Sequence, residues 1–105
     1  MIAWVFLAVA VVTEVAAALS LRAATHGSWA WYLVVALGYA TAFTMLSLAL
    51  NEGMPLGVAY GVWTAAGVAL TAVLGALLFR EPFTWIMAAG IALIVGGVVL
   101  VQVGA

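Results

Sequence analysis

Long apolar runs alternate with short polar turns along the whole chain. The runs cover residues 2–21, 29–50, 56–79 and 83–103, and the segments between them hold both prolines, the histidine and all but one of the charged residues. Each run has about the 20 residues that a helix rising ~1.5 Å per residue needs to cross ~30 Å of hydrocarbon. The pattern predicts a single all-α integral membrane domain over residues 1–105, with four transmembrane helices and short turns.

The composition supports lipid as the solvent of these helices. Of the 105 residues, 70% are hydrophobic and 5% are charged, whereas soluble domains are roughly 25% charged. A small soluble protein could not hide so much apolar surface from water. The runs also do not fit membrane β-strands, because such strands are only ~10 residues long and strictly alternate apolar and polar residues.

Several function classes are excluded by what the sequence contains. It has no cysteine, one histidine and a net charge of −1. These counts predict no disulfide, no metal site and no nucleic-acid surface. No nucleophile–base pair is recognisable either, so we expect neither an enzyme nor a bound cofactor.

The charged turns suggest how the chain crosses the membrane. Four crossings place Arg22 and Arg80 on one side, which the positive-inside rule makes cytoplasmic. The difference between two arginines on one side of the membrane and none on the other is a small bias. The sequence therefore also allows a chain that inserts in both orientations. We expect the turn residues His26, Glu52, Arg80 and Glu81 to be solvated.

Glu14 is the one charged residue inside a predicted span. It lies eight residues before Arg22, or ~12 Å along the helix axis. An ionised carboxylate at that depth costs at least a few kcal/mol, and no Lys or Arg in the same span offsets it. Desolvation favours the neutral form, so we predict that Glu14 takes up and releases protons in a working cycle. The alternative is a permanently protonated acid that serves as an interhelical hydrogen bond.

The surroundings of Glu14 are consistent with a ligand site. Helical spacing places the following residues on its face: Leu7, Ala10, Val11, Ala17, Ala18 and Leu21. The alanines indicate either open space or the close approach of another helix, and the sequence does not decide between them. In the third span, one stripe contains Tyr60, Trp63, Thr64, Gly67 and Thr71. Aromatic faces attract organic cations, so an acid with such a stripe predicts a site for an apolar cation.

Three features together resemble the small multidrug resistance transporters over essentially the whole chain. The first is Glu14-Val15 in the first helix. The second is the segment from Pro55 to Trp63, Pro-Leu-Gly-Val-Ala-Tyr-Gly-Val-Trp, which is similar to the family's P-x-G-x-A-Y-x-x-W. The third is the pair Gly90 and Gly97, which matches the spacing of the family's dimerisation glycines.

The resemblance implies an antiparallel homodimer in the bacterial inner membrane, with its two copies inserted in opposite orientations. Both Glu14 carboxylates would line one chamber and bind protons and substrate in competition, and the fourth helices would pair through Gly90 and Gly97. The residues expected to line the chamber are Tyr60, Trp63, Tyr39, Leu7, Ala10, Ala17, Ala18 and Phe43.

Departures from the family's branches favour one cargo. The guanidinium-exporting branch carries Gly three residues before its glutamate and Trp three residues after, where this chain has Val11 and Ala17. It also places a serine near the acid, in a region that Phe43 and Thr44 occupy here. The chain is therefore closer to the quaternary-ammonium branch, and we predict a proton-coupled antiporter that exports lipophilic cations.

Two other functions stay open from the sequence. One is the export of guanidinium or polyamines, with a paralogous chain as a possible partner. The other is a membrane adaptor that transports nothing and regulates a larger complex. The first is distinguished by its cargo and the second by ligand binding that does not depend on pH.

Overall fold

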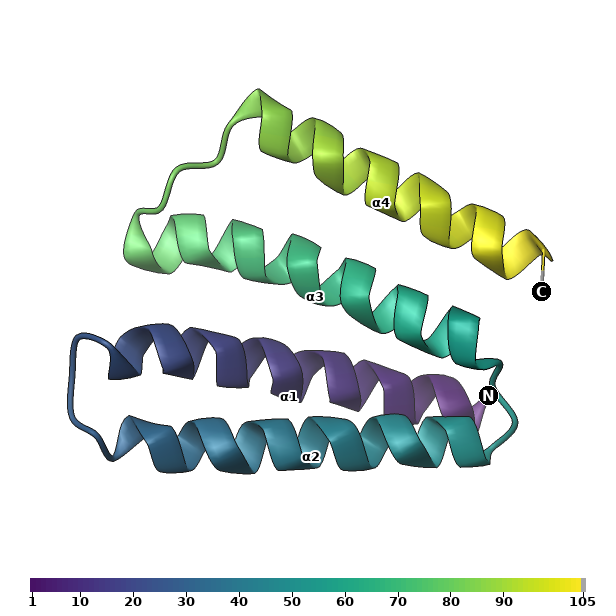
Figure 1. Ribbon diagram of the computed structural model, residues 1–105, viewed down its shortest axis with the longest axis horizontal. Helices are drawn as coiled ribbons and strands as arrows, with labels where there is room; N and C mark the ends of the chain where they lie inside the picture. The colour runs from purple at the N-terminus through teal and green to yellow at the C-terminus, as the bar shows by residue number, and fades with distance from the viewer. Residues whose placement is uncertain (105) are drawn as a thin grey trace.

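The computed structural model describes residues 1–104, which form four α-helices joined by short turns (Figure 1). The helices are α1 (Ile2–Ala24), α2 (Trp31–Asn51), α3 (Leu56–Phe79) and α4 (Trp85–Gly104). Each is long and apolar enough to cross a membrane. The prediction of an all-α protein with four transmembrane helices is confirmed.

Three helix ends differ from the sequence prediction by two or three residues. Helix α2 starts at Trp31 rather than Trp29, and local hydrogen bonds accompany the other two differences. Helix α1 continues to Ala24, and the hydroxyl of Thr25 then donates to the Arg22 carbonyl at 2.7 Å. Helix α4 starts at Trp85 because Thr84 caps it, with the Met87 N–H donating to Thr84 Oγ1 at 3.2 Å.

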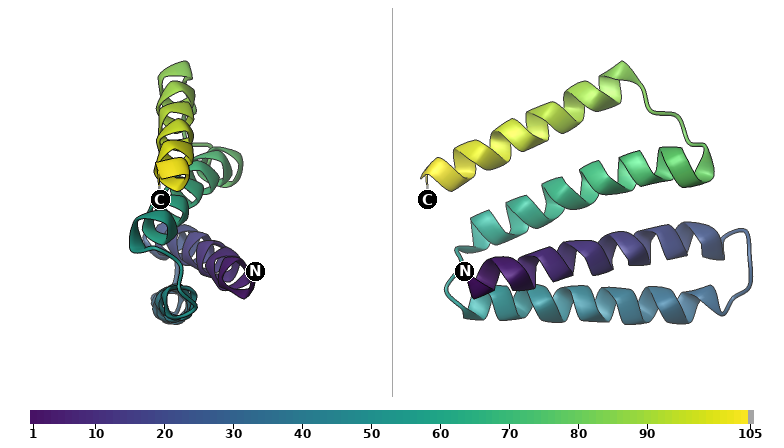
Figure 2. Two further views of the ribbon diagram at one scale, coloured as in Figure 1. Left: turned by 90° about the vertical axis from the view of Figure 1, so that its right-hand side faces the viewer. Right: turned by 180° about the vertical axis from the view of Figure 1, so that it is seen from behind.

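The helices lie side by side in the order α2, α1, α3, α4 (Figure 1). Helix α1 packs against α2 on one side and α3 on the other, while α4 packs only against α3. The array measures 42 × 33 × 15 Å, and its edge-on view shows how shallow it is (Figure 2). Every helix therefore keeps a long face outside the array, where lipid or another chain can cover it.

Burial is concentrated on α1, the second helix of the array. Leu7 is 1% exposed and lies in one cluster with Ala10, with Leu46 and Ala49 of α2 and with Ala59 of α3. Small residues dominate this cluster because they let membrane helices approach closely. Helix α4, in contrast, has no buried residue in the part that the structure describes.

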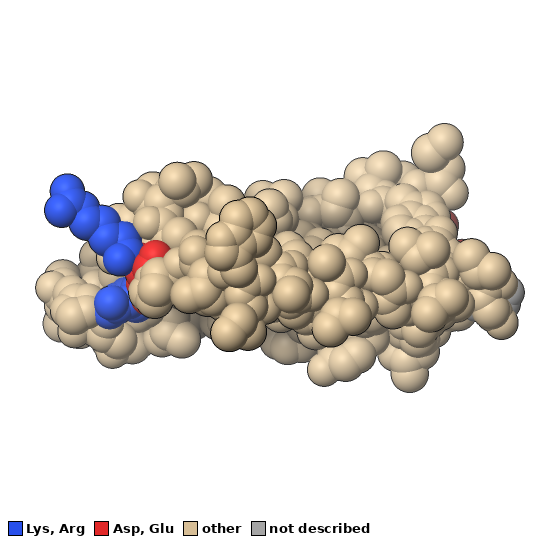
Figure 3. Space-filling model, turned by 90° about the horizontal axis from the view of Figure 1, so that it is seen from above, with Lys and Arg blue, Asp and Glu red and all other residues tan. Residues whose placement is uncertain are grey.

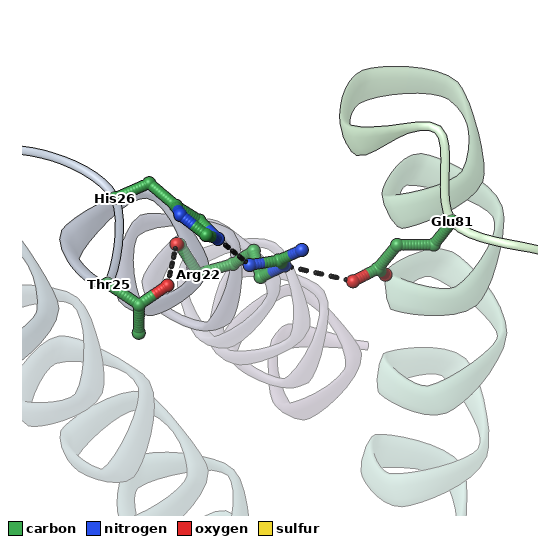
Figure 4. Close-up of polar contacts among 4 residues, drawn as sticks. All are labelled: Arg22, Thr25, His26 and Glu81. Atoms are coloured by element: carbon green, nitrogen blue, oxygen red, sulfur yellow. Dashed lines mark hydrogen bonds and ion pairs between the residues drawn. The ribbon is translucent and has the colours of Figure 1, made fainter.

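A polar cluster joins α1 to the turn between α3 and α4 (Figure 4). Arg22 Nε lies 3.0 Å from Glu81 Oε2, its guanidinium lies 5.7 Å from the centre of the Phe79 ring, and it is hydrogen-bonded to His26. Glu81 and His26 are therefore paired with Arg22 rather than only solvated. Both arginines sit at the same end of the molecule, as four crossings require (Figure 3).

This ion pair gives a first prediction about stability. The side chains of Arg22 and Glu81 are 40% and 45% exposed, and exposed pairs contribute ~0.2–1 kcal/mol. We expect Arg22→Gln and Glu81→Gln each to lower the free energy of unfolding in mixed micelles by up to about 1 kcal/mol. The exchanged pair Arg22→Glu/Glu81→Arg should recover most of that loss.

Arg80→Gln is the matched control, because Arg80 has no ion-pair partner within residues 1–104. It should leave the unfolding free energy unchanged. An exchanged pair that is as unstable as the two single variants would show that the Arg22–Glu81 contact does not contribute.

Candidate functional site

Glu14 lies where α1 meets α3, and a glycine lets it approach. A Cβ atom built on Gly67 would lie only 2.9 Å from Glu14 Oε2, closer than real Cβ contacts. Gly67 itself is buried, whereas the Glu14 side chain is half-buried. The carboxylate therefore rests directly against the backbone of α3.

A cavity of about 220 Å³ opens beside this carboxylate. Helix α3 supplies five of its six lining residues and α1 supplies Glu14. The lining residues are Glu14, Tyr60, Trp63, Thr64, Gly67 and Val68. The stripe predicted on the third span is thus brought together with the acid of the first, except for Thr71.

Two buried polar atoms of the site have no hydrogen-bond partner within the described chain: the acceptor Glu14 Oε2 and the donor Trp63 Nε1. A buried polar atom left unpaired costs about 1–3 kcal/mol. Both residues line the same cavity. The arrangement therefore has unused capacity to bind a group that enters the cavity.

An aromatic cluster stands next to the acid. The Trp63 ring lies 5.7 Å from that of Tyr60 and 5.3 Å from that of Phe43 in α2, the latter in an edge-to-face arrangement. Phe43 thus stands close to the site without lining the cavity of the single chain. Tyr39, also in α2, is half-buried and does not line this cavity either.

The charge of Glu14 has no protein counter-charge at its level of the membrane. Its one ion-pairing candidate on α1, Arg22, is bonded to Glu81 at the end of the array. Within residues 1–104, no group of three or more His, Cys, Asp or Glu side chains could hold a metal ion. The site chemistry is that of one carboxylate with aromatic rings, which suits a proton or an organic cation.

Other predicted lining residues lie elsewhere in the single chain. Leu7 and Ala10 belong to the packed core, and Ala17 is fully buried against Gly38 of α2. Ala18 is half-buried and does not line the cavity. For Ala10 and Ala17, the structure thus favours close helix approach over open space.

The predicted interface glycines of α4 face open space in the single chain. No atom lies within 4 Å of a Cβ built on Gly90 or on Gly97. These positions are therefore available to a second chain.

Sequence reasoning missed two residues at the site. Val68 lines the cavity four residues after Thr64, so helical periodicity could have found it. Gly38 contacts the turn of α1 that carries Glu14. No pattern marked it, because a glycine in an apolar span does not indicate which helix it faces.

Comparison with known proteins gives consistent matches. The family model described as Small Multidrug Resistance protein matches residues 2–94. The chain is 40% identical over 100 residues to multidrug resistance protein EbrA of Bacillus licheniformis, covering 94% of both chains. It is 38% identical over 99 residues to EbrB of the same organism, covering 93% of this chain and 82% of that one. It is 37% identical over 103 residues to EbrA of Bacillus subtilis, covering 97% of both.

The contact between Gly67 and Glu14 gives a second prediction. A methyl group at position 67 collides with the carboxylate, so Gly67→Ala must displace Glu14 or α3. We expect a loss of about 1–3 kcal/mol in the free energy of unfolding in mixed micelles. Gly61→Ala, in the same helix, is the control because its Cβ would meet only Val98 at 3.9 Å. Equal stability of the two variants would contradict the close approach.

Proposed function

The chain belongs to the small multidrug resistance family, and from this premise we propose that it exports lipophilic cations in exchange for protons through Glu14. Membership of this family makes the protein a transporter of the bacterial inner membrane rather than an enzyme. The proposal adds the coupling ion, the class of cargo and the residue that binds both.

The observation that carries the proposal is the buried, unpaired Glu14 Oε2 at the edge of a cavity. An ionised carboxylate in lipid needs a partner, and the described chain offers none at that depth. A proton or a bound cation can each meet this need, and both cannot do so at once. Competition for one carboxylate couples the two fluxes.

The aromatic rings support an organic cation as cargo. Tyr60 and Trp63 line the cavity with Glu14, and a cation over an aromatic face gains about 0.5–2 kcal/mol. A lipophilic cation sheds its water at small cost on entering such a site, whereas a strongly hydrated ion loses several kcal/mol. The site therefore favours quaternary ammonium and related cations over inorganic ones.

Three features support a working unit of two copies in opposite orientations. A cavity of about 220 Å³ is smaller than the ~300–1,000 Å³ of sites for drug-sized ligands, and two facing cavities reach that range. Helix α4 has no buried residue and exposes Gly90 and Gly97 for close packing. The positive-inside bias of two arginines is small enough to allow both insertions.

The cycle follows from these parts. Deprotonated Glu14 pairs with the cation while the chamber is open to the cytoplasm. The dimer then opens to the other side, where protons displace the cation from the carboxylate. The protonated dimer returns and releases its protons into the cytoplasm.

This mechanism gives a third prediction. Purified protein should bind a quaternary ammonium cation less tightly as the pH falls, because protons occupy Glu14. Glu14→Gln keeps the size of the side chain but removes its charge, so it should abolish both this binding and cation transport driven by a pH gradient in proteoliposomes.

Glu52→Gln is the control, because Glu52 is exposed in the turn between α2 and α3. It should transport at the unsubstituted rate. Proton-driven export that persists in Glu14→Gln would overturn the mechanism.

A further inference from the structure

Helix α2 touches α1 beside Glu14, through Gly38. A Cβ atom built on Gly38 would lie 2.8 Å from Ala17 Cβ, 3.3 Å from Ala17 Cα and 3.3 Å from the carbonyl oxygen of Thr13. Real Cβ atoms do not approach to 2.8 Å, so even an alanine at position 38 would force a shift. The spacing of α1 and α2 at this level depends on the absence of a side chain.

The part of α1 that Gly38 touches is the turn that carries Glu14. Thr13 precedes Glu14 and Ala17 follows it by three residues, and both lie in the continuous helix. Ala17 is fully buried, so an added methyl group on Gly38 has no free space on this side of the turn. At the same turn, Gly67 of α3 meets the Glu14 carboxylate. Two glycines thus contact this turn, Gly38 at its backbone and Gly67 at the carboxylate.

Gly38 also sets the position of the α2 aromatic residues. Tyr39 is its neighbour in sequence. Phe43 follows five residues later and contacts Trp63 at a ring distance of 5.3 Å. If α2 moved away from α1, both aromatic side chains would move relative to the acid and the cavity.

We propose that Gly38 is a positioning residue of the exchanger: it holds α2 against the Thr13–Ala17 turn and so fixes where Glu14 meets α3 and the aromatic side chains. This inference rests on the proposed function, because it concerns how the same carboxylate binds protons and cations. In this proposal the contact of Gly38 with Thr13 and Ala17 serves the site, whereas the core cluster of α1 and α2 serves stability.

The experiment exchanges the small residues across this contact. Gly38→Ala adds a methyl group where none fits, and Ala17→Gly removes the methyl group that it would strike. We expect Gly38→Ala to weaken binding of tetraphenylphosphonium about tenfold, within the range of overpacking effects. We also expect the pH at half-maximal binding to shift by about 0.5 unit or more. The double variant Ala17→Gly/Gly38→Ala should restore both values.

Gly61→Ala is the matched control, because its methyl group meets only Val98 at an ordinary 3.9 Å. It should leave both binding values unchanged. A Gly38→Ala protein that binds like Gly61→Ala would overturn the proposal, and so would a double variant that fails to restore binding.

If Gly38→Ala alone does not fold, the double variant carries the test. It must then fold and bind like the unsubstituted protein, and failure to do so overturns the proposal. The unsubstituted protein separates the two hypotheses. If it binds no cation at any pH, the proposed function fails; if it binds and the position-38 variants do not differ, only the role of Gly38 fails.

Discussion

The structure depends on a carboxylate that lies at membrane depth without a counter-charge. Glu14 is ~12 Å from the nearest arginine of its own helix, and that arginine is bonded to Glu81 at the end of the array. Glu14 is nevertheless not sealed in a core, because it lies half-buried at the edge of a cavity with an unpaired oxygen. The proposed exchange requires a carboxylate whose ionised form is unfavourable without a partner and which a proton or a cation can reach. In the proposed mechanism its depth also selects the cargo, since a cation that dehydrates at small cost is favoured there.

The flat shape of the chain is consistent with the proposal that two copies form the site. Four helices in one shallow array leave long faces outside it, and the cavity beside Glu14 is lined almost entirely from α3. In water, such exposed apolar faces would promote aggregation, but in lipid they cost little, and association then relies on close packing of small residues. An incomplete cavity and an unburied α4 with open glycines are therefore compatible with a stable membrane chain.

The sequence predicted the helices and one half of the site well, and the reason is periodicity along a single element. Apolar runs define four spans, and helical spacing gathers Tyr60, Trp63, Thr64 and Gly67 on one face of α3. What the sequence could not predict is which faces meet. Helices that are apolar all round have no polar side to orient them, so the burial of Leu7 against Leu46 and of Ala17 against Gly38 had no signal. The helix ends at Ala24 and Trp85 likewise depend on caps from Thr25 and Thr84, which hydropathy does not detect.

The unequal packing of the helices limits how the cavity can change. Helices α1 and α2 meet with backbone-level contact at Gly38 and Ala17, and the contact includes fully buried residues such as Ala42 and Ala49. Helices α1 and α3 are packed less extensively. Ala59 of α3 joins the core cluster and Gly67 meets the Glu14 carboxylate beside the cavity. At one end the Arg22–Glu81 pair joins α1 to the turn that follows α3. A movement that opens the site costs least where packing is loosest, so α3 is expected to move relative to an α1–α2 pair that stays together. Glu14 would stay with the pair while Tyr60 and Trp63 move with α3. In the proposed cycle, opening would then separate the carboxylate from the aromatic rings and weaken cation binding at the stage when a proton replaces the cation.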